Sequence, residues 1–313
     1  MLRNRIATSV AKLIKLKSLK AILWVVLIGF ALLFLGYGIH TSWNQLSQYK
    51  WSADFRFLFL SFALYPASLL PLLWGWHWIM SRLGEISDFG TNVKIYCYSC
   101  LPKHIPGVIW HIASRIYLYE ERGVAYSVAL LGTILETMIL IVSGLLIYLL
   151  SLPIDSLGKT IHGLRVSSAL LIVIPLGVVL HRATFNRVFG FLSKRFKCPA
   201  VVSMTQRDMS ILLFIYSLAW IVGGMVLYLL ANAVCVVPIS KLPALIGIWA
   251  ATGTVSLITS FVLSGPGAIT ITMSLLLGNY VPLPVAIVIS LLFRILLTVG
   301  EVFWALVLSR LLR

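Results

Sequence analysis

Long apolar stretches separated by short charged segments make up most of the chain. A helix of about 20 apolar residues spans the hydrocarbon core of a bilayer, which is roughly 30 Å thick. Stretches of this kind predict full spans at Ala21–Ile39, Phe57–Met80, Val124–Leu150, Val166–Leu180, Met209–Leu230 and Leu291–Leu308. The pattern therefore predicts an all-α polytopic membrane protein with about six full spans.

Two further apolar segments carry helix breakers near their middle. Ile95–Tyr119 contains Pro102 and Pro106-Gly107, and Leu242–Val281 contains the run Ser264–Gly267. A broken backbone in hydrocarbon leaves N–H and C=O groups unpaired, so it is tolerated mainly where it lines a polar cavity. We therefore expect two re-entrant elements, each a pair of half-helices.

The loops support this interpretation. Residues 82–94 and 181–208 both indicate the cytoplasmic side, the second with six Lys and Arg residues against one acid. An even number of crossings must separate them, and Val124–Leu150 with Val166–Leu180 supplies two. Ile95–Tyr119 should then enter and leave on one side. Arg310 and Arg313 place the C-terminal end on the cytoplasmic side as well. The same count of crossings then requires Leu242–Val281 to start and end outside, so this segment is re-entrant from the opposite side.

The two halves of the chain then have the same order of elements. Residues 1–150 and 151–313 each hold two spans, one broken element and one further span, and they enter the membrane from opposite sides. We interpret this as an inverted repeat within a single integral membrane domain, 1–313. Broken elements at corresponding positions of two inverted halves are typical of a transport site near the bilayer midplane.

Composition agrees with a membrane protein. The chain is 60% hydrophobic and 11% charged, with a mean hydropathy of +1.00, which a soluble fold could not hide from water. Its net charge of +16 comes from short basic segments beside apolar spans. The positive-inside rule accounts for this charge without nucleic acid, and the basic residues 1–20 predict a cytoplasmic N-terminus in the inner membrane. A lipid with an anionic head group is the partner this charge favours.

Motifs of enzymes and metal sites are absent. The chain has no HExxH, nucleophile elbow or P-loop. Cys97 and Cys100 have CxxC spacing but no second pair, so we interpret them as packing residues. We therefore expect no catalytic site, no cofactor and no metal.

Ionisable residues inside the apolar segments are the candidate functional groups. A charge in the bilayer costs roughly 2.5–3.5 kcal/mol on insertion scales, so it usually pairs or faces water. These residues are Lys103, His104, His111, Arg115, Glu136, Arg294 and Glu301, with His77 a weaker candidate. Two interpretations remain open: the carboxylates pair with arginines and hold the bundle together, or the basic groups bind an anionic head group.

The Pro-Gly breaks offer a second way to bind an anion. A half-helix that begins near Pro106-Gly107 or Pro266-Gly267 would direct unpaired N–H groups and its positive dipole end at the ligand. In the alternative, Gly267 only permits close packing. Arg294 and Glu301 are seven residues apart and so share one helix face.

At these residues the chain resembles the flippase-like family related to the transmembrane region of lysylphosphatidylglycerol synthase. The matching residues are Lys103, Ile105-Pro106-Gly107, Trp110, Arg115, Gly123, Glu136, Pro266-Gly267, Arg294 and Glu301. The second motif departs from the family pattern, because Ala268–Met273 replaces a further Gly and a charged pair.

The resemblance implies flippase-like translocation of an anionic or polyprenyl-phosphate-linked glycolipid between leaflets. We see no synthase domain, so we expect a glycan carrier lipid rather than a lysyl lipid. The expected substrate-binding residues are Lys103, Pro106, Gly107, Trp110, His111, Arg115, Glu136, Pro266, Gly267, Arg294 and Glu301. We also expect Arg115→Ala to abolish head-group binding and leave the protein folded.

Two alternatives belong to other functional classes. A non-transporting membrane subunit would scaffold a glycosyltransferase or lipid synthase supplied by another chain. An integral-membrane transferase acting on a lipid phosphate would need an acid or base such as Glu136.

Overall fold

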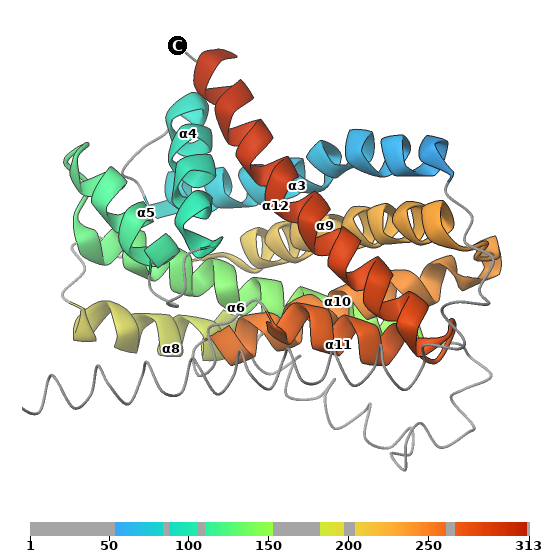
Figure 1. Cartoon of the computed structure of the whole chain (residues 1–313). Helices are drawn as coiled ribbons and strands as arrows, with labels where there is room; N and C mark the ends of the chain where they lie inside the picture. The colour runs from blue at the N-terminus through green and yellow to red at the C-terminus, as the bar shows by residue number, and fades with distance from the viewer. Residues whose placement is uncertain are drawn as a thin grey trace, which may run out of the picture.

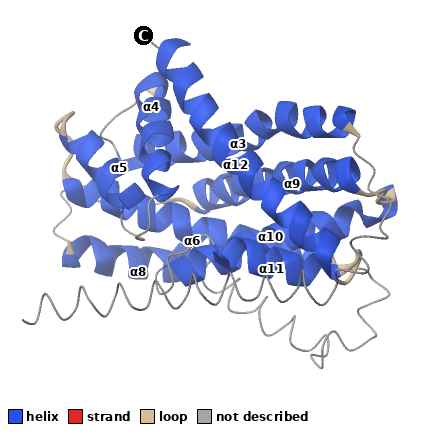
Figure 2. Ribbon diagram, in the orientation of Figure 1, coloured by secondary structure: helices blue, strands red, loops and turns tan. Residues whose placement is uncertain are grey.

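The computed structural model describes residues 54–83, 88–104, 110–152, 182–196, 204–260 and 267–311. Regular structure in these residues is helical, without a strand among them (Figure 2). Five of the described helices are long and apolar enough to cross a membrane, α10 being counted together with the short 3-10 helix η3 before it. They are α3 (Phe55–Leu83), α6 (Tyr126–Leu150), α9 (Gln206–Val234), η3 (Ile239–Lys241) with α10 (Leu242–Ser260), and α12 (Leu283–Leu311). The chain is therefore an all-helical, multi-pass membrane protein.

Four of the predicted spans correspond to α3, α6, α9 and α12. The predicted spans Ala21–Ile39 and Val166–Leu180 lie outside the described residues. The total of six spans, the inverted repeat and the placement of the N-terminus stay predictions.

The first broken segment is a helix pair joined by a short 3-10 helix. It consists of α4 (Phe89–Cys100), η1 (Leu101–His104) and α5 (Trp110–Glu120), and α4 and α5 pack against each other. The second consists of α10 and α11 (Gly267–Leu277), which also pack together. Residues 105–109 and 261–266, which hold the predicted breaks, lie outside the described part. Helix α10 is itself long enough to cross the membrane. That either broken segment enters and leaves the membrane on one side stays a prediction.

Helix α9 is central to the bundle. It packs against α3, α6 and α10, and these four helices run side by side in Figure 1. Helix α12 crosses them obliquely and contacts α3, α4, η1, α9 and α11. Helix α8 (Arg182–Arg195) lies at the edge of the bundle beside α6.

Apolar packing falls into two main clusters. One joins α3, α4, α5, α6 and α9 around fully buried side chains such as Trp76, Leu135 and Tyr216. The other joins α9, α10, α11 and α12 around Leu227 and Phe293. The functional candidates described below lie in and beside these clusters.

Side-chain caps begin helices α4 and α9. Asp88 accepts a hydrogen bond from the Thr91 N–H at 2.7 Å and caps α4. Hydrogen bonds from Thr91 hold the pKa of this exposed carboxyl below its usual range. Thr205 and Asp208 form a capping box that begins α9. Gly123, with φ of +79°, occupies the left-handed region in the turn between α5 and α6.

Glycines let α9 approach its neighbours closely. A Cβ placed on Gly224 would lie 2.4 Å from the backbone Cα of Ile246 on α10. On the same helix, a Cβ on Gly223 would meet the Trp249 ring at 2.2 Å. Lipid tails are as apolar as helix surfaces, so helices in a bilayer associate through such close packing.

We predict that Gly224→Ala lowers the thermal stability of the purified protein in detergent. The added methyl meets backbone, and overpacking costs about 1–3 kcal/mol, which exceeds the roughly 1 kcal/mol gained in helix propensity. The matched control is Gly190→Ala on α8, where a Cβ would meet nothing within 4 Å. Equal melting temperatures for the two variants would contradict the close α9–α10 approach.

Candidate functional site

A buried ion pair joins α5 to α6. Arg115 is 3% exposed and Glu136 4% exposed, and the Arg115 Nη1 donates to Glu136 Oε2. The Arg115 Nε donates to Ser99 Oγ on α4 at 3.1 Å. A guanidinium so far from water needs such compensation, because an unpaired buried charge is costly.

Two aromatic rings enclose the same cation. The guanidinium carbon of Arg115 lies 4.1 Å from the ring centroid of Trp76 on α3 and 4.5 Å from that of Tyr96 on α4. A desolvated cation over an aromatic face gains about 2 kcal/mol or more. Arg115 is therefore held by a carboxylate, a hydroxyl and two rings.

The carboxylate of Glu136 extends these contacts to α9. Tyr216 donates its hydroxyl to Glu136 Oε1 at 3.5 Å, the outer limit of a hydrogen bond. The ring of Tyr216 also packs against Gly75 of α3, where a Cβ would lie 2.6 Å from it. The ion pair and its neighbours thus connect α3, α4, α5, α6 and α9.

A neutral hydrogen-bond chain lies beside the ion pair. Trp76 Nε1 donates to the Tyr119 hydroxyl at 2.7 Å, and this hydroxyl donates to Asn92 Oδ1 at 2.6 Å. The Asn92 amide lies 3.1 Å from His77 Nδ1. His77, a weak candidate by sequence, belongs to this chain and packs its ring edge-on to Phe89.

This geometry matches the first of the two interpretations that the sequence left open for Arg115. Its charge is compensated inside the protein, so in this conformation it holds helices together. Removing one partner of a buried pair typically costs about 3–5 kcal/mol. The expected outcome of Arg115→Ala changes accordingly, from a folded protein that cannot bind to a destabilised one.

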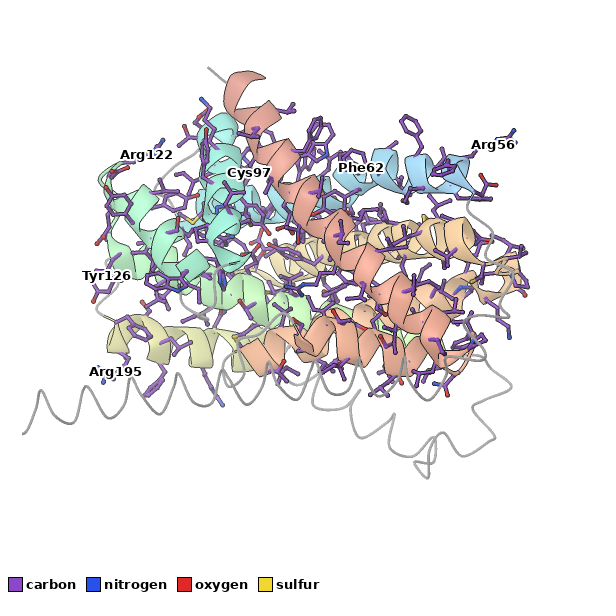
Figure 3. All side chains as sticks on the ribbon, in the orientation of Figure 1. Arg56, Phe62, Cys97, Arg122, Tyr126 and Arg195 are labelled. Atoms are coloured by element: carbon purple, nitrogen blue, oxygen red, sulfur yellow. The ribbon has the colours of Figure 1, made fainter. Side chains whose placement is uncertain are left out.

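A second polar group lies on α12, where Arg294 and Glu301 are both half-buried. Tyr65 of α3 donates its hydroxyl to Glu301 Oε1 at 3.2 Å, and its ring packs on Gly300. Cys97 of α4, the helix that α12 contacts, is half-buried. Figure 3 shows Cys97 and Phe62 on either side of α12.

The remaining sequence candidates are dispersed. Lys103 and His104 belong to η1, which contacts α12. Trp110 and His111 begin α5, with Trp110 53% exposed and His111 half-buried. Gly267 is the first residue of α11. Pro106, Gly107 and Pro266 lie outside the described residues.

Several contact residues could not be found from the sequence. Trp76, Tyr96 and Tyr216 are aromatic residues in apolar segments that hold many others. Ser99 lies inside the CxxC spacing, which does not indicate a hydrogen bond to an arginine. Spacing carries no signal either, since Tyr216 follows Glu136 by 80 positions.

A further ion pair fastens the ends of α3 and α9. Arg82 Nη2 lies 2.9 Å from Asp208 Oδ1, which also accepts a 3.3 Å hydrogen bond from Trp78 Nε1. Within the described ranges, no three His, Cys, Asp or Glu side chains converge on a point that could hold a metal ion.

Comparison with known proteins adds no relative, since no protein-family model and no curated protein matches the chain. The flippase-like resemblance therefore stays a prediction carried by the residues named for it.

We predict that Arg115→Met lowers the free energy of unfolding by about 3–5 kcal/mol, because it leaves Glu136 buried without its counter-charge. The double variant Arg115→Met with Glu136→Leu should recover much of this loss, since an apolar pair of similar volume removes both charges. Denaturant titration in detergent measures both effects.

The control for this pair is Arg122→Met, which removes an exposed cation that donates to the Leu118 carbonyl. Its stability should stay within about 0.5 kcal/mol of wild type. If the double variant were no more stable than Arg115→Met, the pair would not account for the loss.

Proposed function

We propose that this protein moves a lipid with an anionic head group between the two leaflets of its membrane. The observation that supports this most directly is the position of α12. This helix contacts α4 and η1 of the first broken segment and α11 of the second, and it carries Arg294 and Glu301. The interrupted elements of both halves therefore meet a helix with two embedded ionisable groups.

The physical reasoning concerns the head group. Lipid tails stay in hydrocarbon throughout, so the barrier to crossing comes from removing a charged head group from water. Donors placed along the path lower this barrier. Arg294 offers a planar fork that matches two phosphate oxygens, and Lys103, on the neighbouring η1, belongs to the same region.

Arg115 has a different part in this proposal. Its guanidinium is engaged by Glu136, Ser99 and the two rings, so it holds α4 and α5 against the bundle. The broken segment then keeps a defined position while the head group passes along α12. We therefore assign phosphate contact to Arg294 and Lys103 ahead of Arg115.

The charge distribution supports an orientation. Arg122 and Arg195 lie at one end of the bundle and Arg56 at the other (Figure 3). Lys194, adjacent to Arg195 in the last turn of α8, is exposed as well. By the positive-inside rule this end faces the cytoplasm of an inner membrane. A polyprenyl-phosphate-linked glycolipid is the substrate that the resemblance implies.

A second candidate function follows from the compensation of Arg115. A charge fully neutralised by its own protein is also what a scaffold subunit would contain. Such a subunit would hold a glycosyltransferase or lipid synthase, would tolerate substitution of Lys103 and Arg294, and would co-purify with its enzyme.

We predict that wild-type protein in proteoliposomes moves a labelled anionic carrier lipid between leaflets. Arg294→Gln should slow this movement by about tenfold or more, because a charge-assisted hydrogen bond contributes roughly 1.5–3 kcal/mol. A leaflet-resolved assay measures the rate. Arg187→Gln, which removes an exposed cation on α8, serves as the control and should leave the rate unchanged.

Two results would decide against this proposal. Absence of movement across a broad panel of anionic lipids would favour the scaffold, and so would a normal rate in Arg294→Gln together with Lys103→Gln.

A further inference from the structure

The hydrogen-bond chain beside the buried ion pair has a direction that its chemistry fixes. An indole N–H only donates, so the 2.7 Å bond from Trp76 Nε1 makes the Tyr119 hydroxyl an acceptor. The single hydrogen of this hydroxyl then goes to Asn92 Oδ1 at 2.6 Å. This distance suits two oxygens and is shorter than N–H···O bonds usually are. The oxygen of the Asn92 amide, and not its nitrogen, therefore faces Tyr119.

His77 accepts the next hydrogen bond of the chain. With its oxygen turned to Tyr119, the Asn92 amide has its nitrogen 3.1 Å from His77 Nδ1. An amide nitrogen only donates, so Nδ1 carries no hydrogen and the ring proton lies on Nε2. Nε2 is 3.4 Å from Ser81 Oγ, whose own hydrogen goes to the His77 carbonyl at 2.8 Å. The complete chain thus contains a neutral His77 in one defined tautomer.

Protonation of His77 would leave one donor of this chain without an acceptor. A protonated imidazole donates from both nitrogens, so Nδ1–H would face the N–H of Asn92. Rotation of the Asn92 amide would relieve that contact, but it would turn the amide nitrogen toward Tyr119 and deprive the Tyr119 hydroxyl of its acceptor. Tyr119 is fully buried, and an unpaired buried donor is costly. Both arrangements therefore weaken the chain.

His77 lies at the accessible end of the chain. Its side chain is half-buried, and Ser81, one turn further along α3, is exposed. The ring of His77 packs edge-on to Phe89 of α4, which is 41% exposed. Histidine is the residue type that gains a proton between about pH 5 and about pH 8. The chain therefore runs from a titratable group near the surface to the fully buried Trp76.

Charged groups on the elements packed against α3 have other contacts. Helices α4, α6, α9 and α12 pack against α3. Their carboxylates near this part of the bundle are Asp88, which caps α4, Glu136, which pairs with Arg115, Asp208, which pairs with Arg82, and Glu301, which accepts from Tyr65. Lys94 of α4 is half-buried. Within the described ranges, none of these carboxylates forms an ion pair with His77. A proton gained by His77 would therefore have no counter-charge in contact with it there.

We propose that His77 is a proton sensor that controls how α4 and α5 are joined to α3. Neutral His77 completes the chain through Asn92 of α4 and Tyr119 of α5 to Trp76, whose ring centroid lies 4.1 Å from the guanidinium carbon of Arg115. Protonation opens this chain and leaves the ion pair of Arg115 as the remaining polar connection. Helix α4 leads into the first broken segment, so the sensor acts on that segment. The inference concerns how the helices are joined and does not depend on the proposed function.

The first test compares melting temperatures in detergent at about pH 8 and about pH 5.5, toward the two ends of the range in which histidine titrates. His77→Asn places an oxygen that does not titrate where Nδ1 lies, so it accepts the Asn92 N–H at both pH values. Between the two pH values, wild type should lose about 2–4 °C more than His77→Asn, the shift expected for one unpaired buried donor. An equal loss in the two proteins would overturn the sensor.

Tyr119→Phe separates the sensor from a simple effect of histidine charge. Without the hydroxyl, Asn92 is free to turn its oxygen toward a protonated His77. This variant should therefore melt below wild type at about pH 8, because Trp76 loses its acceptor, and yet lose less on acidification than wild type does.

The matched control is Tyr228→Phe, which removes a hydroxyl that donates to the Val237 carbonyl at 3.1 Å on α9. It should show the same loss on acidification as wild type. If Tyr119→Phe also kept the full wild-type loss, the hydrogen-bond chain would not be the origin of the pH dependence and the proposal would be wrong.

Discussion

A guanidinium buried in a membrane protein must find its counter-charge within the protein, and the packing of half of this bundle depends on how Arg115 meets that requirement. Glu136 supplies the charge from α6, Ser99 supplies a hydroxyl from α4, and Trp76 of α3 supplies a ring. These partners come from different helices. Each of these helices therefore has a defined position relative to α5. Apolar packing alone would permit the helices to slide along one another.

The part of the bundle formed by α9, α10, α11 and α12 is held together differently. Between α9 and α10 the contact is made by glycines against large side chains, with Gly224 against Ile246 and Gly223 against Trp249. Close packing of this kind involves no charge, and α12 crosses the bundle with Arg294 and Glu301 half-buried. The two parts of the bundle are thus held together by different interactions, an ion pair in one and close glycine packing in the other.

Both parts meet at α4. This helix accepts a hydrogen bond from Arg115 through Ser99, and it contacts α12. A shift of α12 would consequently displace α4, which the contacts of Arg115 hold in place. In our proposal the compensated charge stabilises the fold and the half-buried groups of α12 contact the lipid, so the two sets of embedded charges have different tasks.

The sequence by itself determined the membrane class and the positions of α3, α6, α9 and α12, because the length and apolarity of a span are local properties set by bilayer thickness. It also singled out Arg115, Glu136, Arg294 and Glu301, since any charge in such a segment is costly. Which charges pair is not local. Arg115 and Glu136 are 21 residues apart on different helices, and no periodicity relates them.

Only the tertiary structure showed that Arg115 is buried and paired with Glu136, and that Arg294 and Glu301 lie half-buried on α12. The tertiary structure alone selected Trp76, Tyr96 and Tyr65 from among the 37 aromatic residues of the chain, which are 10 Trp, 12 Tyr and 15 Phe. The physical reason is that an aromatic side chain has the same apolar character wherever it stands in a span. Whether it faces lipid, packs in the core or encloses a cation depends on which helices lie beside it.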